Sequence, residues 1–310
     1  MLCRCRVNPS LSLTLREEKV ERRSFLIAAG CALASATSLA LARKIAPFGG
    51  AALAQGVAEL EVASQGRLGI AILDIDSGER FLWRADDRFP MCSTFKFLLG
   101  AAILRRVERG QEALDRSVPV TAADLVDNSP MSEKRVGGHA TVGELCEATI
   151  TLSDNAAANL LLPAVGGPAG LTHFIRSLGD GVTRLDRNEP SLNEARPGDP
   201  RDTTTPLAML GLLDRLLLGS GLSPESRGQL TGWMLGTRTA DHRLRAGLPA
   251  GWRIADKTGA GNGSDNEVGL LWSPAGRPLL VSSYITGSPL SLAETNAIHA
   301  RLGTLIAAAV

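Results

Sequence analysis

The 310-residue chain is poor in the residues that build metal centres and nucleic-acid-binding surfaces. Its four histidines, His139, His173, His242 and His299, are scattered, and its five cysteines form no Cys-x-x-Cys pair. Zinc sites need clustered ligands of these types, so we expect no metal and no cofactor. Aromatic residues make up 4% of the chain, the formal charge is +1, and no basic patch is interleaved with aromatics. We therefore expect no nucleic-acid partner.

The first 54 residues have the pattern of an export signal and linker. A twin arginine at residues 22–23 precedes a moderately hydrophobic segment, residues 27–42, that is rich in small residues. This order is typical of a twin-arginine signal peptide, and the segment is too short and too interrupted to predict a stable membrane span. Cleavage after Ala42 and cleavage after Ala54 fit equally well, and a short amphipathic helix is the alternative interpretation. The sequence thus predicts an exported protein, periplasmic or secreted.

Strand patterns lie near both ends of the remaining chain. Apolar alternation over residues 68–75 precedes the turn Asp76-Ser77-Gly78, and the apolar run at 81–83 follows it, which predicts a hairpin after a helix at 56–65. Three further strand patterns run from residue 252 to residue 285, and an amphipathic helix closes the chain at 291–308. Helical patterns dominate from residue 93 to residue 235.

These elements predict an α+β fold in which an antiparallel sheet, built from both ends of the chain with flanking helices, receives an inserted all-helical lobe. We place the α/β lobe at residues 55–87 plus 236–310 and the helical lobe at 88–235. We expect the active site between them. Residues 179–206, rich in Gly, Pro, Asp and Asn, show little periodicity, and a long loop of this kind in a compact domain is usually functional or disordered.

Ser93 and Lys96 open a long apolar helical pattern, residues 95–104. Residues three apart share a helix face, so the hydroxyl and the amine can meet. A serine becomes a nucleophile when a base takes its proton, and a desolvated lysine can be that base. Taken alone, the pattern is short and common, and a helix cap beside a surface lysine explains it equally simply.

Three further motifs follow in the chain. They are Ser153-Asp154-Asn155 at the start of a helical pattern, Glu189 with Asn193 in the long loop, and Lys257-Thr258-Gly259 at the end of a strand pattern. With Ser93-x-x-Lys96, this set and its order resemble the signature of class A serine β-lactamases. The resemblance covers roughly residues 56–310.

The resemblance implies an acyl-enzyme mechanism for the hydrolysis of the β-lactam amide bond of penicillins and cephalosporins. Ser93 would attack the β-lactam carbonyl, and Ser153 would pass a proton to the departing nitrogen, with Lys257 keeping the site electropositive. Lys96 and Glu189 are the two candidate bases for acylation, and that choice stays open. Glu189 would activate the deacylating water, which Asn193 would help to hold.

The same resemblance implies how a substrate is held. Backbone N–H groups of Ser93 and Ala260 would form the oxyanion hole, while Asn155 would bind the substrate amide and Thr258, beside Gly259, its carboxylate. No arginine follows the Lys-Thr-Gly motif in residues 262–267. We therefore assign the carboxylate-binding guanidinium to Arg243, with Arg238 and Arg245 expected to be surface arginines.

Two further pairs of positions depend on the resemblance. Arg187 and Asp202 fall where the family closes its omega-shaped loop with an ion pair. Cys92 and Cys146 match positions that are disulfide-bonded in some relatives, but the partner positions hold Gly261 and Gly100, so both thiols should be free and buried.

Two other functions remain as alternatives. A D-alanyl-D-alanine peptidase or esterase of the same superfamily shares the serine and lysine motifs, but it lacks the loop that carries Glu189 and Asn193. A β-lactam-binding sensor domain would become acylated and stay acylated.

We expect a monomer acting on a small-molecule substrate. The preference among penicillins, cephalosporins and carbapenems is not predicted, because it depends on loop positions around Asn128, Ala260 and Gly261.

Overall fold

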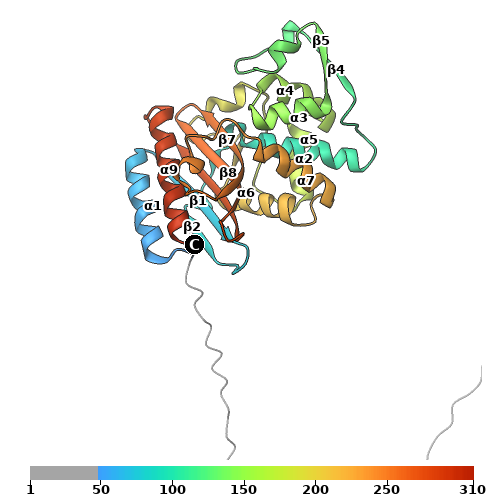
Figure 1. The fold of residues 1–310 in the computed structure, drawn as a ribbon. Helices are drawn as coiled ribbons and strands as arrows, with labels where there is room; N and C mark the ends of the chain where they lie inside the picture. The colour runs from blue at the N-terminus through green and yellow to red at the C-terminus, as the bar shows by residue number, and fades with distance from the viewer. Residues whose placement is uncertain (1–47) are drawn as a thin grey trace, which may run out of the picture. The chain divides into compact units, whose positions relative to one another are not determined.

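The computed structural model describes residues 48–310, which belong to one compact unit. The predicted signal features, the twin arginine, the apolar segment and the cleavage position after Ala42, lie outside these residues. The centre of the unit is a five-stranded antiparallel sheet in the order β2-β1-β9-β8-β7 (Figure 1). Its strands are β1 (Arg67–Asp74), β2 (Arg80–Trp83), β7 (Arg253–Gly261), β8 (Ser264–Trp272) and β9 (Pro278–Thr286). The sheet therefore joins both ends of the described chain, as the strand patterns predict.

The sheet is buried on both faces, because alternate side chains of each strand enter different hydrophobic clusters. In β1, Ile70 and Ile72 belong to one cluster and Ala71 to the other. In β9, Val281 and Tyr284 divide in the same way. Two layers of helices are therefore needed to cover the sheet.

Helices α1 (Gly50–Ser64) and α9 (Leu292–Ala308) lie side by side over one face (Figure 1). The helix α1 begins at Gly50 rather than at residue 56, because Phe48 and Leu53 are buried in the cluster beneath it. Position 54, the expected end of the linker, consequently lies inside α1. Cleavage after Ala54 would remove buried apolar side chains from this face.

The other face is covered by the helical half of the molecule (Figure 1). Its helix α6 (Pro206–Leu213) packs on β1 and β9. The helices of this half are α2 (Phe95–Glu108), α3 (Val142–Thr151), α4 (Asn155–Leu161), α5 (Gly167–Ser177), α6 (Pro206–Leu213) and α7 (Pro224–Leu235). The short helix α8 (Leu244–Gly247) then leads into β7.

Two short ladders were not indicated by the sequence patterns. They pair β3 (Phe89–Pro90) with β6 (Thr203–Thr204) and β4 (Ser117–Val120) with β5 (Gly138–Thr141). Each of these strands is too short to show a clear alternation. The first ladder joins the end of the long loop to the chain just before α2.

Helix α2 is the centre of the helical half. Residues 95–104 are all buried, as its apolar pattern predicts. Cys92 and Cys146 are free and buried, and burial raises the pKa of both thiols. Among residues 48–310, no helix is long and apolar enough to cross a membrane.

Candidate active site

Ser93 lies in a short 3₁₀ turn, Cys92–Thr94, that leads directly into α2. The strand β7 packs against this turn. A Cβ atom on Gly259 would lie 2.8 Å from the Met91 carbonyl oxygen and 3.1 Å from the Ser93 nitrogen, so only glycine allows this approach. The next residue, Ala260, is exposed at the end of β7. The structure thus brings the Lys-Thr-Gly strand to the start of the Ser-x-x-Lys helix.

The Ser93 hydroxyl contacts the carboxylate of Glu189. Ser93 Oγ donates a hydrogen bond of 3.3 Å to Glu189 Oε1, and Lys96 Nζ lies 3.0 Å from the same oxygen. No hydrogen bond links Ser93 to Lys96 in the described part of the chain, although the sequence places them on one helix face. Glu189, from a loop far along the sequence, connects the two side chains instead.

Lys96 is fully buried among hydrogen-bond acceptors. Its Nζ donates to the backbone carbonyl of Ser153 at 2.8 Å, to Ser153 Oγ at 3.4 Å and to the side-chain oxygen of Asn155. Burial lowers the pKa of Lys96, and the attraction of Glu189 offsets this only in part. The neutral amine, which can accept a proton, is therefore favoured relative to an exposed lysine.

Ser153 stands between two lysines. Lys257 Nζ donates to Ser153 Oγ at 3.1 Å, the same oxygen that Lys96 Nζ contacts at 3.4 Å. Burial lowers the pKa of Lys257 well below its usual value, with the charges of Lys96 and Arg243 adding to the effect. The backbone of Ser153 is left-handed, with φ of 57°, a conformation that costs a non-glycine residue about 1–3 kcal/mol. The residues around Ser153 therefore stabilise a strained backbone, which places the hydroxyl between the two lysines.

Asp154, the middle residue of the Ser-Asp-Asn motif, holds the backbone next to Ser153 in place. Asp154 caps α4 by accepting from the Ala157 N–H at 2.8 Å, and it also accepts from the backbone N–H groups of Met131 and Ser132 at 2.9 Å. Asn155 donates to the Asp127 carbonyl at 2.7 Å. Both side chains tie the start of α4 to the loop before β5, which gives a structural reason for the motif.

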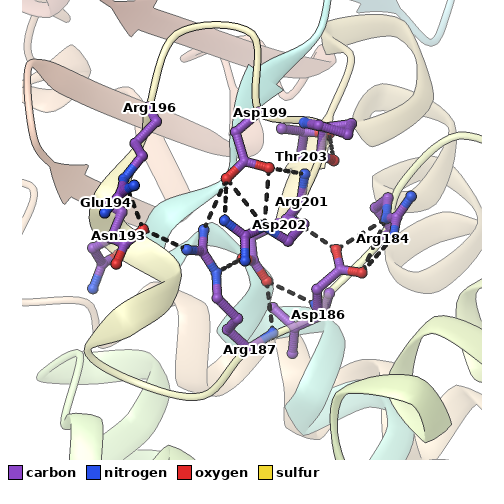
Figure 2. A network of polar contacts seen from close by, with 12 residues as sticks. Arg184, Asp186, Arg187, Asn193, Glu194, Arg196, Asp199, Arg201, Asp202 and Thr203 are labelled. Atoms are coloured by element: carbon purple, nitrogen blue, oxygen red, sulfur yellow. Dashed lines mark hydrogen bonds and ion pairs between the residues drawn. The ribbon is translucent and has the colours of Figure 1, made fainter.

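The long loop is fastened by the ion pair expected between Arg187 and Asp202. Arg187 Nε lies 2.6 Å from Asp202 Oδ2, and Asp202 Oδ1 accepts from the backbone N–H groups of Asp186 and Arg187 (Figure 2). Arg187 also contacts Glu194 at 2.8 Å. The two ends of the loop are thereby joined, and within the loop Glu189 Oε2 accepts a hydrogen bond of 2.6 Å from Asn193.

Arg243 lies directly before α8, and its side chain is buried. Its Nη1 donates to the carbonyl of Asn266 at 2.6 Å and approaches the carbonyl of Gly259 at 3.4 Å. Arg245 pairs instead with Asp256, and Arg238 is exposed. Arg245 thus reaches β7 before the motif, whereas Arg243 contacts the Lys-Thr-Gly motif itself through the carbonyl of Gly259.

The structure adds three residues that the sequence motifs do not reveal. Asn159 binds the backbone of Glu189, Thr239 shares a hydrogen bond of 2.6 Å with the Thr258 hydroxyl, and Asp265 pairs with Arg243. Asn159 follows the Ser-Asp-Asn motif by one helical turn, which is the only local signal for any of them. The other two contacts form between separate segments and have no sequence pattern.

The site unites a serine hydroxyl, a carboxylate, two buried lysines and a second serine, an arrangement suited to acyl transfer with several proton relays. Within residues 48–310, no group of three or more metal-ligating side chains is present.

Comparison with known proteins agrees with this geometry. The model of the β-lactamase enzyme family Beta-lactamase2 matches residues 52–310. The chain is 44% identical to Beta-lactamase L2 of Stenotrophomonas maltophilia over 295 residues, covering 92% of this chain and 97% of that protein. A solved structure of the class A β-lactamase of the last common ancestor of Gram-negative bacteria is also similar. Its TM-score is 0.82 and its sequence identity is 57%, covering 84% of this chain and 99% of that chain. A β-lactamase structure from Xanthomonas campestris is similar with a TM-score of 0.81 and 47% identity, over 83% of this chain and 96% of that one.

Proposed function

The chain belongs to the class A β-lactamase family and is a β-lactamase enzyme, and on that premise we propose that it opens β-lactams through a Ser93 acyl-enzyme that Glu189 helps water to hydrolyse. The contact of 3.3 Å between Ser93 Oγ and Glu189 Oε1 carries this proposal. A base beside the nucleophile is also beside the ester that forms there. The acyl-enzyme therefore does not persist.

In acylation, the Ser93 oxygen attacks the β-lactam carbonyl while its proton passes to Glu189 or to the amine of Lys96. Glu189 Oε1 accepts a hydrogen bond from Ser93 Oγ, and Lys96 Nζ lies 3.0 Å from the same carboxylate oxygen. The carbon–nitrogen bond then breaks, and the nitrogen takes a proton from the Ser153 hydroxyl. Lys96 and Lys257, at 3.4 Å and 3.1 Å from Ser153 Oγ, can replace that proton. Backbone N–H groups of Ser93 and Ala260 stabilise the oxyanion.

In deacylation, Glu189 takes a proton from a water molecule, whose oxygen attacks the ester carbon. The bond to Ser93 Oγ breaks, and the proton that Glu189 took from the water passes to Ser93 Oγ, 3.3 Å away, so that both groups return to their starting state. Asn193 and Asn159 support this role, because they hold the carboxylate and the backbone of Glu189. The same base argues against a peptidase or a sensor domain, whose acyl-enzymes do not need this loop.

The substrate is held by polar groups along β7 and α4. Thr258 and Gly259 flank its carboxylate, with Arg243 and Lys257 supplying positive charge, and Asn155 binds its amide side chain. Arg243 supports this assignment through its contact with the Gly259 carbonyl. Every side chain in this scheme comes from one chain, so we also propose that the enzyme acts as a monomer, exported with a twin-arginine signal.

The full chain mixed with benzylpenicillin or a chromogenic cephalosporin tests the proposal, with turnover and intact mass followed together. We expect many turnovers per enzyme molecule and no lasting adduct. A stoichiometric adduct that persists would point to a peptidase or a sensor. Ser93→Ala should form no covalent adduct while retaining the unfolding temperature of the parent, and an adduct on that variant would exclude Ser93 as the nucleophile.

A further inference from the structure

Each of the three nitrogens of the Arg243 guanidinium contacts another group of the protein. Nη2 lies 2.7 Å from Asp265 Oδ1, Nε donates to Asn296 Oδ1 at 2.8 Å, and Nη1 donates to a backbone carbonyl at 2.6 Å. Of these partners only Asp265 carries a charge. It comes from β8, in register with Ala260 at the end of the Lys-Thr-Gly strand.

The ion pair between Arg243 and Asp265 is almost completely removed from water. The side chains are 5% and 2% exposed, so their charges interact more strongly than those of a surface pair. Asp265 Oδ2 has no hydrogen-bond partner among the described residues, and His299 Nε2 lies 4.0 Å from it. Burial lowers the pKa of His299, which favours the neutral ring. The negative charge of Asp265 is therefore matched by Arg243 alone.

We propose that Asp265 determines specificity by occupying and neutralising Arg243, which limits how strongly this guanidinium attracts a substrate carboxylate. The inference rests on the proposed role of Arg243. A substrate carboxylate and Asp265 would compete for the same cation, and like charges this close repel each other. Carboxylate binding then depends more on the hydroxyl pair of Thr258 and Thr239 and on Lys257.

Asp265→Asn is the most direct test, because asparagine keeps the shape and an oxygen acceptor for Nη2 but removes the charge. We expect the KM for benzylpenicillin to fall by at least about threefold with kcat little changed, as for a gain in uniform binding. The methyl ester of benzylpenicillin lacks the anion, so its kinetics should not change. Asp265→Glu, which restores the charge, should return the KM toward that of the parent.

Controls separate charge removal from a general disturbance. Asp241→Asn removes an exposed carboxylate that pairs with Arg245 rather than Arg243, and it should leave the KM unchanged. If Asp265→Asn does not fold, Asp265→Thr suits a strand, keeps a hydroxyl acceptor and serves the same comparison. In an Arg243→Ala background, the effect of either substitution on the KM should disappear.

The outcomes distinguish this inference from the function it rests on. If Arg243→Ala leaves the ratio of kcat/KM for the acid and the ester unchanged, the proposed role of Arg243 is wrong. If that ratio falls but neither Asp265→Asn nor Asp265→Thr lowers the KM, Arg243 keeps its role and the inference about Asp265 is overturned. The inference about Asp265 would also be overturned if Asp265→Asn lowered the KM for benzylpenicillin equally in the Arg243→Ala background and in the parent.

Discussion

Asn159 holds the backbone of Glu189 from both sides. Its Oδ1 accepts from the Glu189 N–H at 3.0 Å, and its Nδ2 donates to the Glu189 carbonyl at 2.9 Å. Asn159 lies on α4, the helix that begins with the Ser-Asp-Asn motif. The two parts of the site that hold the proton donor and the base are thereby fixed to one rigid element.

Replacing Asn159 with alanine should disturb both stability and deacylation. Two backbone groups of Glu189 would lose their partners, which costs about 1–3 kcal/mol for each buried group left unsatisfied. We expect a lower unfolding temperature and a larger decrease in the deacylation rate than in the acylation rate, measured by stopped-flow and mass spectrometry. Asn262→Ala is the matched control, because Asn262 contacts the same loop from an exposed position. Equal loss of both rates would contradict the positioning role.

Glu189→Gln should cause the acyl-enzyme to accumulate. The amide keeps the shape of the side chain but cannot take a proton from water, and general-base catalysis typically contributes about 10²–10⁴ in rate. Intact mass should show an adduct during turnover of benzylpenicillin. Glu194→Gln, in the same loop but facing Arg187, should keep steady turnover without an adduct. Normal turnover by Glu189→Gln would remove this residue from deacylation.

Asp202→Asn should loosen the long loop. Asp202 is buried, and its loss of charge leaves Arg187 without its shortest ion pair. Removing one partner of a buried ion pair typically costs about 3–5 kcal/mol. We expect a lower unfolding temperature together with faster hydrogen exchange over residues 186–202. Asp199→Asn, which affects a more peripheral contact of Arg187, should produce a smaller loss. Unchanged exchange in Asp202→Asn would show that the ion pair does not hold the loop.

Glu267→Gln should change how stability depends on pH. Burial, followed by the neighbouring Asp256 carboxyl, raises the pKa of Glu267 well above 4.5. The folded protein therefore keeps a proton that the unfolded chain loses, and stability falls as the pH rises above about 4.5 toward the folded pKa. The glutamine variant has no such proton to lose. Its stability relative to the parent should grow by about 1.4 kcal/mol per pH unit within that window.

Urea unfolding at several pH values between 5 and 8 measures this difference. Because Glu267 contacts the backbone N–H of Leu244 through Oε2, glutamine can keep that acceptor. Glu133→Gln, which changes an exposed glutamate between β4 and β5, is the control and should show no growing difference. If the stability difference between the parent and Glu267→Gln is constant across this pH range, the folded protein does not keep a proton on Glu267.

The sequence alone determined the order and nature of the main elements. The alternation over β1, the apolar strand patterns of β7, β8 and β9 and the continuous apolar pattern of α2 are local features, which a single chain displays directly. The four motifs could be found for the same reason, since each is a short run of neighbouring residues. The lobe boundaries and the roles assigned to the motif residues stay predictions.

Tertiary structure decided which side chains meet. Ser93 and Lys96 share a helix face, yet the hydroxyl contacts Glu189, which reaches it from a loop tied down by Arg187 and Asp202. Asp265 meets Arg243 only because β8 pairs with β7 beside α8. Such contacts join residues far apart in the chain and leave no periodic pattern. They arise when the sheet and the helices pack, so the charge and pKa of each group in the site depend on the folded structure.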